Sequence, residues 1–236
     1  MLLVGVDENG LGPRLGPLIA TMVSLEVASY ERPQRARLQR VAARVGIGDS
    51  KQTSAFGHMR VAEGLALAIM ESLHGKLPRN VDELLDLLEL DGSELLRAGC
   101  PDRSRAQCWS FEVSLPAFDG DVAEGRAQLA RLRKHGVHLH AARSIVTCAG
   151  RMNEQLRQLG SRSSVDLAMF ERLVLAAASA SGDAELEIVL GMVGGIRDYE
   201  RYFSLLSPES VSDAQRTKQA VSYRVAGVGS LSFEID

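Results

Sequence analysis

The sequence predicts an α/β protein built around a mixed β-sheet with helices on both faces. A short, apolar, β-branched run at residues 2–8 opens the chain, and amphipathic stretches of helical period then alternate with further short apolar runs. Strands that come first and then alternate with helices are typical of a mixed sheet. No repeat and no long linker is present, so we expect one domain, 1–236, with inserted helical segments near 29–44 and 75–105.

The elements follow from local patterns along the chain. Residues 2–8 predict a buried strand that ends in a glycine-rich turn, and residues 17–27 predict a second strand, so the chain should open as a hairpin. The expected helices cover residues 29–44, 53–73, 80–97, 121–136, 153–180 and 198–206. The other expected strands cover residues 109–115, 137–148, 186–193, 221–225 and 231–235.

Composition narrows the class of protein. Apolar residues make up 45% and charged residues 24%, which is ordinary for a globular chain, and the net charge of -3 gives no strong attraction to nucleic acid or to membranes. Nucleic-acid binding would therefore need a local basic surface. No apolar run approaches the roughly 20 residues of a membrane span, and no signal peptide is recognisable. The three cysteines do not have the spacing of a disulfide framework, which indicates that they are reduced thiols. We therefore expect a cytoplasmic protein without a membrane partner.

The first strand ends in two adjacent carboxylates, Asp7 and Glu8. Consecutive strand side chains point to opposite faces, so one of the two should face the covered side of the sheet. Burying a carboxylate is costly without a compensating cation, which a divalent metal ion would supply. Gly10 and Gly12 allow the backbone to approach a ligand closely, and Pro13 fixes the turn. The alternative is a polar hairpin loop at the surface.

A second candidate element lies before the predicted helix that starts at Thr53. Ser50 and Lys51 supply a hydroxyl and a cation close to a helix N-terminus, where phosphate groups bind readily. A helix cap followed by an exposed lysine is the simpler interpretation of this segment when it is taken alone.

Together the two elements resemble the type II ribonuclease H (ribonuclease HII) family. The run from Asp7 to Pro13 is similar to the opening signature of that family, and the run from Asp49 to Lys51 is similar to its Asp-Ser-Lys motif. The resemblance covers about the first 50 residues. It implies a ribonuclease H-like fold and a metal-dependent endonuclease that cuts the RNA strand of RNA–DNA hybrids, or ribonucleotide-containing duplex, with Mg²⁺ or Mn²⁺.

The resemblance also implies roles for particular residues. Asp7 and Glu8 would be the catalytic carboxylates and metal ligands. The glycine-rich loop would read the 2′-hydroxyl, the group that distinguishes RNA from DNA. The implied nucleic-acid-binding residues are Gly10, Gly12, Pro13, Arg14, Ser50 and Lys51.

The sequence departs from the family at functionally important positions. Leu11 stands where the family has arginine, with Arg14 as a nearby substitute. Gly191 stands where the third carboxylate is expected, at the end of the strand predicted over 186–193, and Asp213 is a weak candidate for the fourth. Tyr223 is either the tyrosine that packs on a nucleic-acid sugar or an ordinary strand residue.

These departures leave two hypotheses. The first is a ribonuclease HII-like endonuclease with an altered active site. The second is a catalytically inactive nucleic-acid-binding relative, which is motivated by Gly191. The sequence identifies no protein partner.

Overall fold

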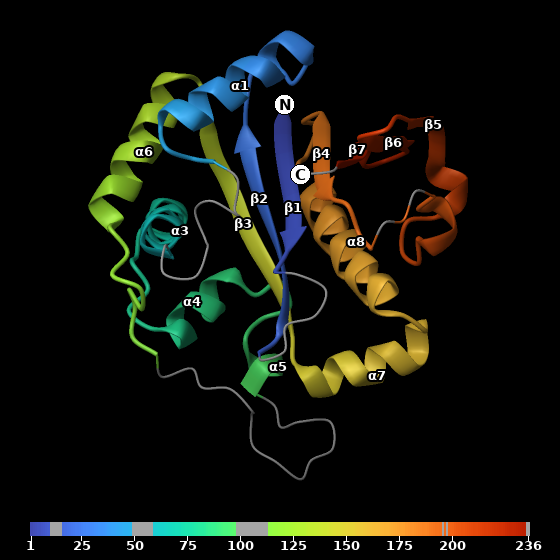
Figure 1. Ribbon diagram of the computed structural model, residues 1–236, viewed down its shortest axis with the longest axis horizontal. Coiled ribbons are helices and arrows are strands. Elements are labelled where there is room, and N and C mark those ends of the chain that lie inside the picture. Colours follow the sequence, from blue (N-terminus) through green and yellow to red (C-terminus); the bar gives the residue numbers. More distant parts are fainter. Residues whose placement is uncertain (10–15, 49–58, 98–112, 195, 197, 235–236) are drawn as a thin grey trace. The chain divides into compact units, whose positions relative to one another are not determined.

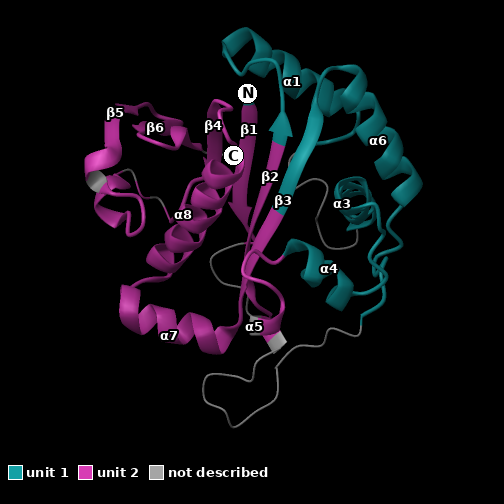
Figure 2. Cartoon of the chain, turned by 180° about the vertical axis from the view of Figure 1, so that it is seen from behind, with its two compact units in different colours: residues 1, 25–88, 110–142 teal, residues 2–24, 89–109, 143–236 magenta. Residues whose placement is uncertain are grey.

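A computed structural model of the chain describes residues 1–9, 16–48, 59–97, 113–194, 196 and 198–234 (Figure 1). The chain divides into two compact units whose segments interleave in the sequence (Figure 2). Unit 1 comprises residues 1, 25–88 and 110–142, and unit 2 comprises residues 2–24, 89–109 and 143–236. The single domain over 1–236 stays a prediction.

The strands form a seven-stranded mixed sheet in the order β3-β2-β1-β4-β7-β6-β5, which confirms the predicted α/β class. Strands β1, β4 and β7 run parallel to one another, while β6 is antiparallel to both β7 and β5. The strands are β1 (Leu2–Glu8), β2 (Leu18–Glu26), β3 (His138–Thr147), β4 (Leu186–Gly191), β5 (Val211–Arg216), β6 (Ala220–Val225) and β7 (Gly229–Glu234).

The helices fall into both units. Unit 1 holds α1 (Arg32–Arg44), α3 (Met59–His74), α4 (Val81–Leu88) and α6 (Val122–Lys134). Unit 2 holds α5 (Glu94–Arg97), α7 (Ala149–Leu159), α8 (Arg162–Ala180) and the 3-10 turns η1 (Glu200–Tyr202) and η2 (Pro208–Ser210). Within the described ranges, no helix combines the length and the apolar character that crossing a membrane requires.

Unit 1 contains a close crossing of α3 and α6. A β-carbon built on Gly125 would lie 2.4 Å from the carbonyl oxygen of Gly64, so the two backbones meet where side chains are absent. The Asp121 carboxylate accepts a hydrogen bond from the backbone N–H of Glu124 and caps α6. The predicted insertion near 29–44 corresponds to α1.

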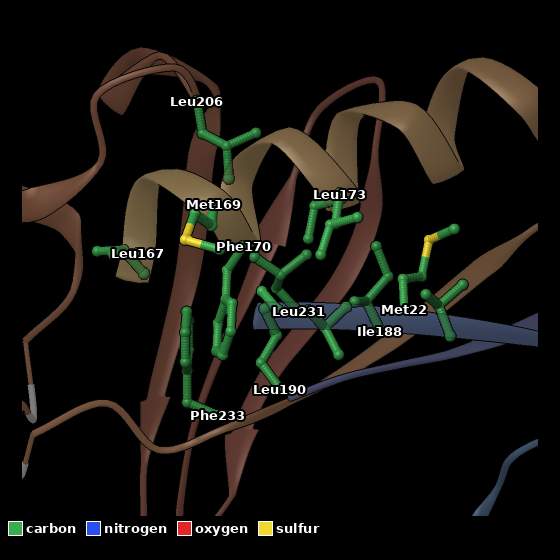
Figure 3. Packing of buried hydrophobic residues seen from close by; sticks show 14 of the residues in the cluster. Met22, Leu167, Met169, Phe170, Leu173, Ile188, Leu190, Leu206, Leu231 and Phe233 are labelled. Atoms are coloured by element: carbon green, nitrogen blue, oxygen red, sulfur yellow. The ribbon is translucent and has the colours of Figure 1, made fainter. Parts of the chain in front are cut away.

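Unit 2 is organised around α8, which packs on β1 and β4 (Figure 1). Phe170 and Leu173 of this helix are fully buried together with Ile188, Leu190 and other strand residues (Figure 3). On β1 the buried positions alternate in the order expected of a strand. The side chains at even positions of β1 therefore face the core. Glu8 lies on this core-facing side of the strand, and Asp7 lies on the opposite side.

Several predicted elements differ from the structure. The helix predicted over 153–180 is two helices, because Gly160 adopts a left-handed conformation at φ 81° and Ser161 then caps α8. Residues 198–206 hold only the turn η1. Residues 109–112 of a predicted strand lie outside the described residues, and Ser114 forms only an isolated bridge with Asn80. Strand β5 was not predicted.

Glu171 of α8 is a buried carboxylate that accepts several hydrogen bonds. It accepts hydrogen bonds of 2.8–3.0 Å from the backbone N–H groups of Ser204, Leu205 and Leu206, and one of 2.7 Å from the Ser204 hydroxyl. The residue as a whole is 2% exposed. It therefore fixes the loop after η1 against α8.

We expect Glu171→Ala to lower the free energy of unfolding by roughly 3 kcal/mol, because it leaves the buried N–H of Leu206 and the part-buried donors of Ser204 and Leu205 without their acceptor. Urea unfolding followed by circular dichroism would measure the change. Glu154→Ala, at an exposed position of α7, is the control and should change stability by less than about 0.5 kcal/mol. Equal stability of the two variants would contradict this role.

Candidate functional site

Asp7 and Glu8 lie at the end of β1, and the structure brings their carboxylates together. Asp7 is exposed and Glu8 is half-buried. A β-carbon built on Gly191 would lie 2.4 Å from Oδ1 of Asp7 and 3.9 Å from Oε2 of Glu8. The two acids thus gather over the end of β4 instead of diverging into solvent.

Asn9 holds the end of β1 in place. Its backbone N–H donates a 3.0 Å hydrogen bond to the Ile19 carbonyl, and the Ile19 N–H donates a 2.9 Å bond to the Asn9 side-chain oxygen. The Asn9 side-chain amide also donates to the Pro17 carbonyl at 3.1 Å. These bonds join the two sides of the opening hairpin directly after Glu8. They restrict the position of the acidic pair at the base of the glycine-rich loop.

Gly191 ends β4 beside Asp7. The parallel register pairs Val6 with Leu190, so the next positions, Asp7 and Gly191, are lateral neighbours. Because Gly191 carries no side chain, the Asp7 carboxylate lies against the backbone of β4. The structure therefore places this position at the acidic site, as the sequence indicated, and it supplies no carboxylate there.

Asp166 of α8 is a third acid at this site, and sequence reasoning missed it. Its side chain is 0% exposed, and neither carboxylate oxygen has a hydrogen-bond partner among the described residues. Burial, followed by the negative charges of Glu8 and then Asp7, raises the pKa of Asp166 to about 7. The three carboxylates therefore act on one another electrostatically.

The helical period explains the position of Asp166. It precedes Phe170 by four residues and Leu173 by seven, so it lies on the buried stripe that faces the sheet. A short turn joins α8 to β4, so the helix runs opposite to that strand and its N-terminal part lies at the carboxyl end of the parallel strands. An acid within an otherwise apolar stripe is the sequence signal that could have identified it.

Glu171 shows why the state of Asp166 is unusual. Both are buried carboxylates on α8, yet Glu171 accepts several hydrogen bonds and Asp166 accepts none from the described residues. A buried carboxylate normally has a hydrogen-bond partner or a cation. Glu171 thus serves the fold, whereas Asp166 fits a site that binds a positive charge.

The other predicted site residues are placed as follows. Gly10, Gly12, Pro13, Arg14, Ser50 and Lys51 lie outside the described residues. Asp213 belongs to the edge strand β5, and β4, β7 and β6 separate that strand from β1.

Tyr223 is a packing residue. Its side chain is 2% exposed, and its hydroxyl accepts a 3.0 Å hydrogen bond from the backbone N–H of Tyr199. Its ring lies edge-on to Phe233. The ordinary strand interpretation is correct, and Tyr223 does not present a surface for a sugar.

The carboxylate oxygens suit Mg²⁺ or Mn²⁺ by their chemistry, since both ions prefer oxygen ligands. Within the described part of the chain, however, no three histidine, cysteine, aspartate or glutamate side chains are arranged so that they could hold a metal ion. The acids are close enough to interact but do not converge fully. The metal ion therefore stays a prediction.

Comparison of the chain with models of known protein families, with curated proteins and with solved structures finds no match in any of the three.

The raised pKa of Asp166 predicts a pH-dependent stability. The unfolded carboxyl ionises near 3.8, whereas the folded one keeps its proton to about 7. The folded state therefore binds more protons between these values, and the free energy of unfolding falls as pH rises through this window. Asp166→Asn removes the penalty, so we expect it to stabilise the protein at pH 8 by on the order of 2–4 kcal/mol, and by much less at pH 4.

Urea unfolding at pH 4 and pH 8 would measure this difference. Asp183→Asn, in the exposed turn before β4, is the matched control and should show no such pH dependence. A destabilised Asp166→Asn protein at pH 8 would show that the carboxylate has a structural partner.

Proposed function

We propose that this protein is a metal-dependent phosphodiester hydrolase of the ribonuclease HII type, acting on the RNA strand of RNA–DNA hybrids or on ribonucleotide-containing duplex. One observation carries the proposal. Asp166 is a fully buried carboxylate without a hydrogen-bond partner among the described residues, and it lies within the electrostatic reach of Glu8 and Asp7.

The acids support a bound divalent cation. Each ionised carboxylate raises the free-energy cost of ionising the other two. A cation bound among them would offset both their mutual repulsion and the cost of burying their charge. Asp7 and Glu8 would hold Mg²⁺ or Mn²⁺ over the end of β4, with Asp166 beneath them. When bound, such an ion activates water and stabilises the leaving oxygen of a phosphodiester.

The arrangement of strands supports the ribonuclease H-like part of the proposal. The acid-bearing strand β1 is an interior strand of the mixed sheet and lies between β2 and β4. Strand β4 runs parallel to it and ends at the position where the resembling family carries its third carboxylate. Helix α8 adds Asp166 from one side of this edge.

The substrate follows from charge and from the resemblance. Clustered carboxylates repel a phosphate backbone, so nucleic acid would bind at Asp7 and Glu8 only after a cation has neutralised them. The choice of RNA rests on the glycine-rich loop, in which Gly10, Gly12 and Pro13 would contact the ribose. Arg14, Ser50 and Lys51 would contact phosphates.

The second candidate function is a nucleic-acid-binding relative that does not cleave. Gly191 favours it, because a position adjoining Asp7 lacks the carboxylate that would complete the site. Such a protein would bind hybrid with an affinity that falls steeply with salt, since phosphate contacts release counterions.

We expect the purified protein to cleave a fluorescently labelled RNA–DNA hybrid in Mg²⁺ or Mn²⁺ and not in EDTA. Asp7→Asn should lower the rate by roughly two orders of magnitude or more, because it removes a ligand to the ion that stabilises the transition state. Asp183→Asn is the control and should keep the wild-type rate.

Gel analysis of the cleavage products, with hybrid binding measured in parallel, separates the possible outcomes. Binding without cleavage would favour the non-catalytic relative. Cleavage that survives Asp7→Asn, or the absence of both binding and cleavage, would refute the ribonuclease proposal.

A further inference from the structure

Helix α1 of unit 1 exposes a group of arginines. Arg37, Arg40 and Arg44 are exposed and follow one another at intervals of three and four residues, so they lie along one side of the helix. Arg32 adds a fourth exposed guanidinium in the first turn. The helix packs through another side, which is marked by Val41 at 4% exposure. We call these four residues the arginine face of α1.

The positive charge of the arginine face is not compensated by acidic residues. Helix α1 contains no aspartate and no glutamate, and none of the four arginines forms an ion pair with a described residue. Helix α6 of the same unit differs, because Arg126 pairs with Glu71 at 2.6 Å and Arg131 pairs with Glu124 at 3.1 Å. The charge on α1 is therefore available to an anionic partner.

The choice of arginine on α1 favours a partner that carries phosphate groups. The helix contains five arginines and no lysine. A guanidinium can donate two parallel hydrogen bonds to one phosphate, whereas a lysine ammonium acts as a point charge. The fifth arginine, Arg35, is half-buried and lies 5.5 Å from the centre of the Tyr30 ring, so it does not belong to the arginine face.

We propose that the arginine face of α1 binds the phosphate backbone of a nucleic-acid duplex. The choice of nucleic acid rests on the proposed function, to which this surface adds a place that holds the backbone. The whole chain has a net charge of -3, so such binding needs a local basic surface. The acids Asp7 and Glu8 belong to unit 2 and α1 belongs to unit 1, so the contact needs no metal ion (Figure 2).

The dimensions and the composition of α1 suit a duplex. The helix rises about 10 Å from Arg37 to Arg44. One strand of a duplex carries a phosphate roughly every 3.4 Å along its axis, so this row spans about three phosphates. A helix that lies on a lipid surface exposes large apolar side chains, whereas the exposed positions of α1 hold only arginine, proline, alanine and glutamine. The composition therefore favours a duplex over a membrane.

Fluorescence anisotropy of a short labelled RNA–DNA hybrid, measured in EDTA over a range of salt concentrations, tests the proposal. We expect the triple variant Arg37→Gln, Arg40→Gln and Arg44→Gln to bind roughly tenfold more weakly or worse, and its dependence of log Kd on log salt concentration to be less steep by about three, because three phosphate contacts are lost. A DNA duplex of the same length should respond in the same way, since phosphate contacts carry no sequence information.

Two further variants separate the arginine face from net charge and from folding. The charge-matched control carries Arg157→Gln, Lys218→Gln and Arg224→Gln, at exposed positions of unit 2, and should retain most of the wild-type affinity. The variant Arg37→Lys, Arg40→Lys and Arg44→Lys should recover the salt dependence and part of the affinity, because it restores the charge without the planar guanidinium.

The outcomes also distinguish the role of α1 from the proposed hydrolase. Equal weakening by the glutamine variant and the charge-matched control, or a lysine variant that does not recover the salt dependence, would overturn the role of α1. A wild type that binds no duplex, or that binds anionic phospholipid vesicles in its place, would overturn it as well. If only the glutamine variant loses binding and the wild type never cleaves, the role of α1 stands and the hydrolase fails. If the wild type cleaves and the glutamine variant binds and cleaves equally well, the hydrolase stands and the role of α1 fails.

Discussion

Negative charge concentrated at the carboxyl end of β1 is the constraint on which the rest of unit 2 depends. Asp7 and Glu8 gather over Gly191, and Asp166 lies buried within their field. Burial and mutual repulsion both oppose ionisation, so a proton or a cation must compensate the charge. With a pKa of about 7, the Asp166 carboxyl changes between its protonated and its ionised form near neutral pH. At the proposed site, a proton on Asp166 and a bound cation would therefore be alternative ways to compensate the same charge.

Much of the fold followed from local patterns in the sequence. The bounds of β1 were predicted as they stand, because a β-branched apolar run ends there in charged residues and glycine. The division of one predicted helix at Gly160 was missed, since apolar periodicity continues across the break. Strand β5 was missed because its residues are mostly polar and exposed, as edge strands often are.

The site was only half predictable for a physical reason. Asp7 and Glu8 adjoin each other in the sequence, so their chemistry could be recognised directly. Asp166 belongs to a helix far along the chain, and its meaning depends on the packing of α8 against β1. Single-sequence reasoning cannot supply register or packing between distant segments.

The parallel pairing of β1 with β4 has a consequence for how the chain folds during synthesis. Leu2 pairs with Leu186, and most of unit 1 is made between them. Strand β4 can therefore pair with β1 only after most of unit 1 has been made, which is a late step in a topology dominated by distant contacts. The end of β1 that carries Asp7 and Glu8 therefore stays without its neighbour β4 until that step.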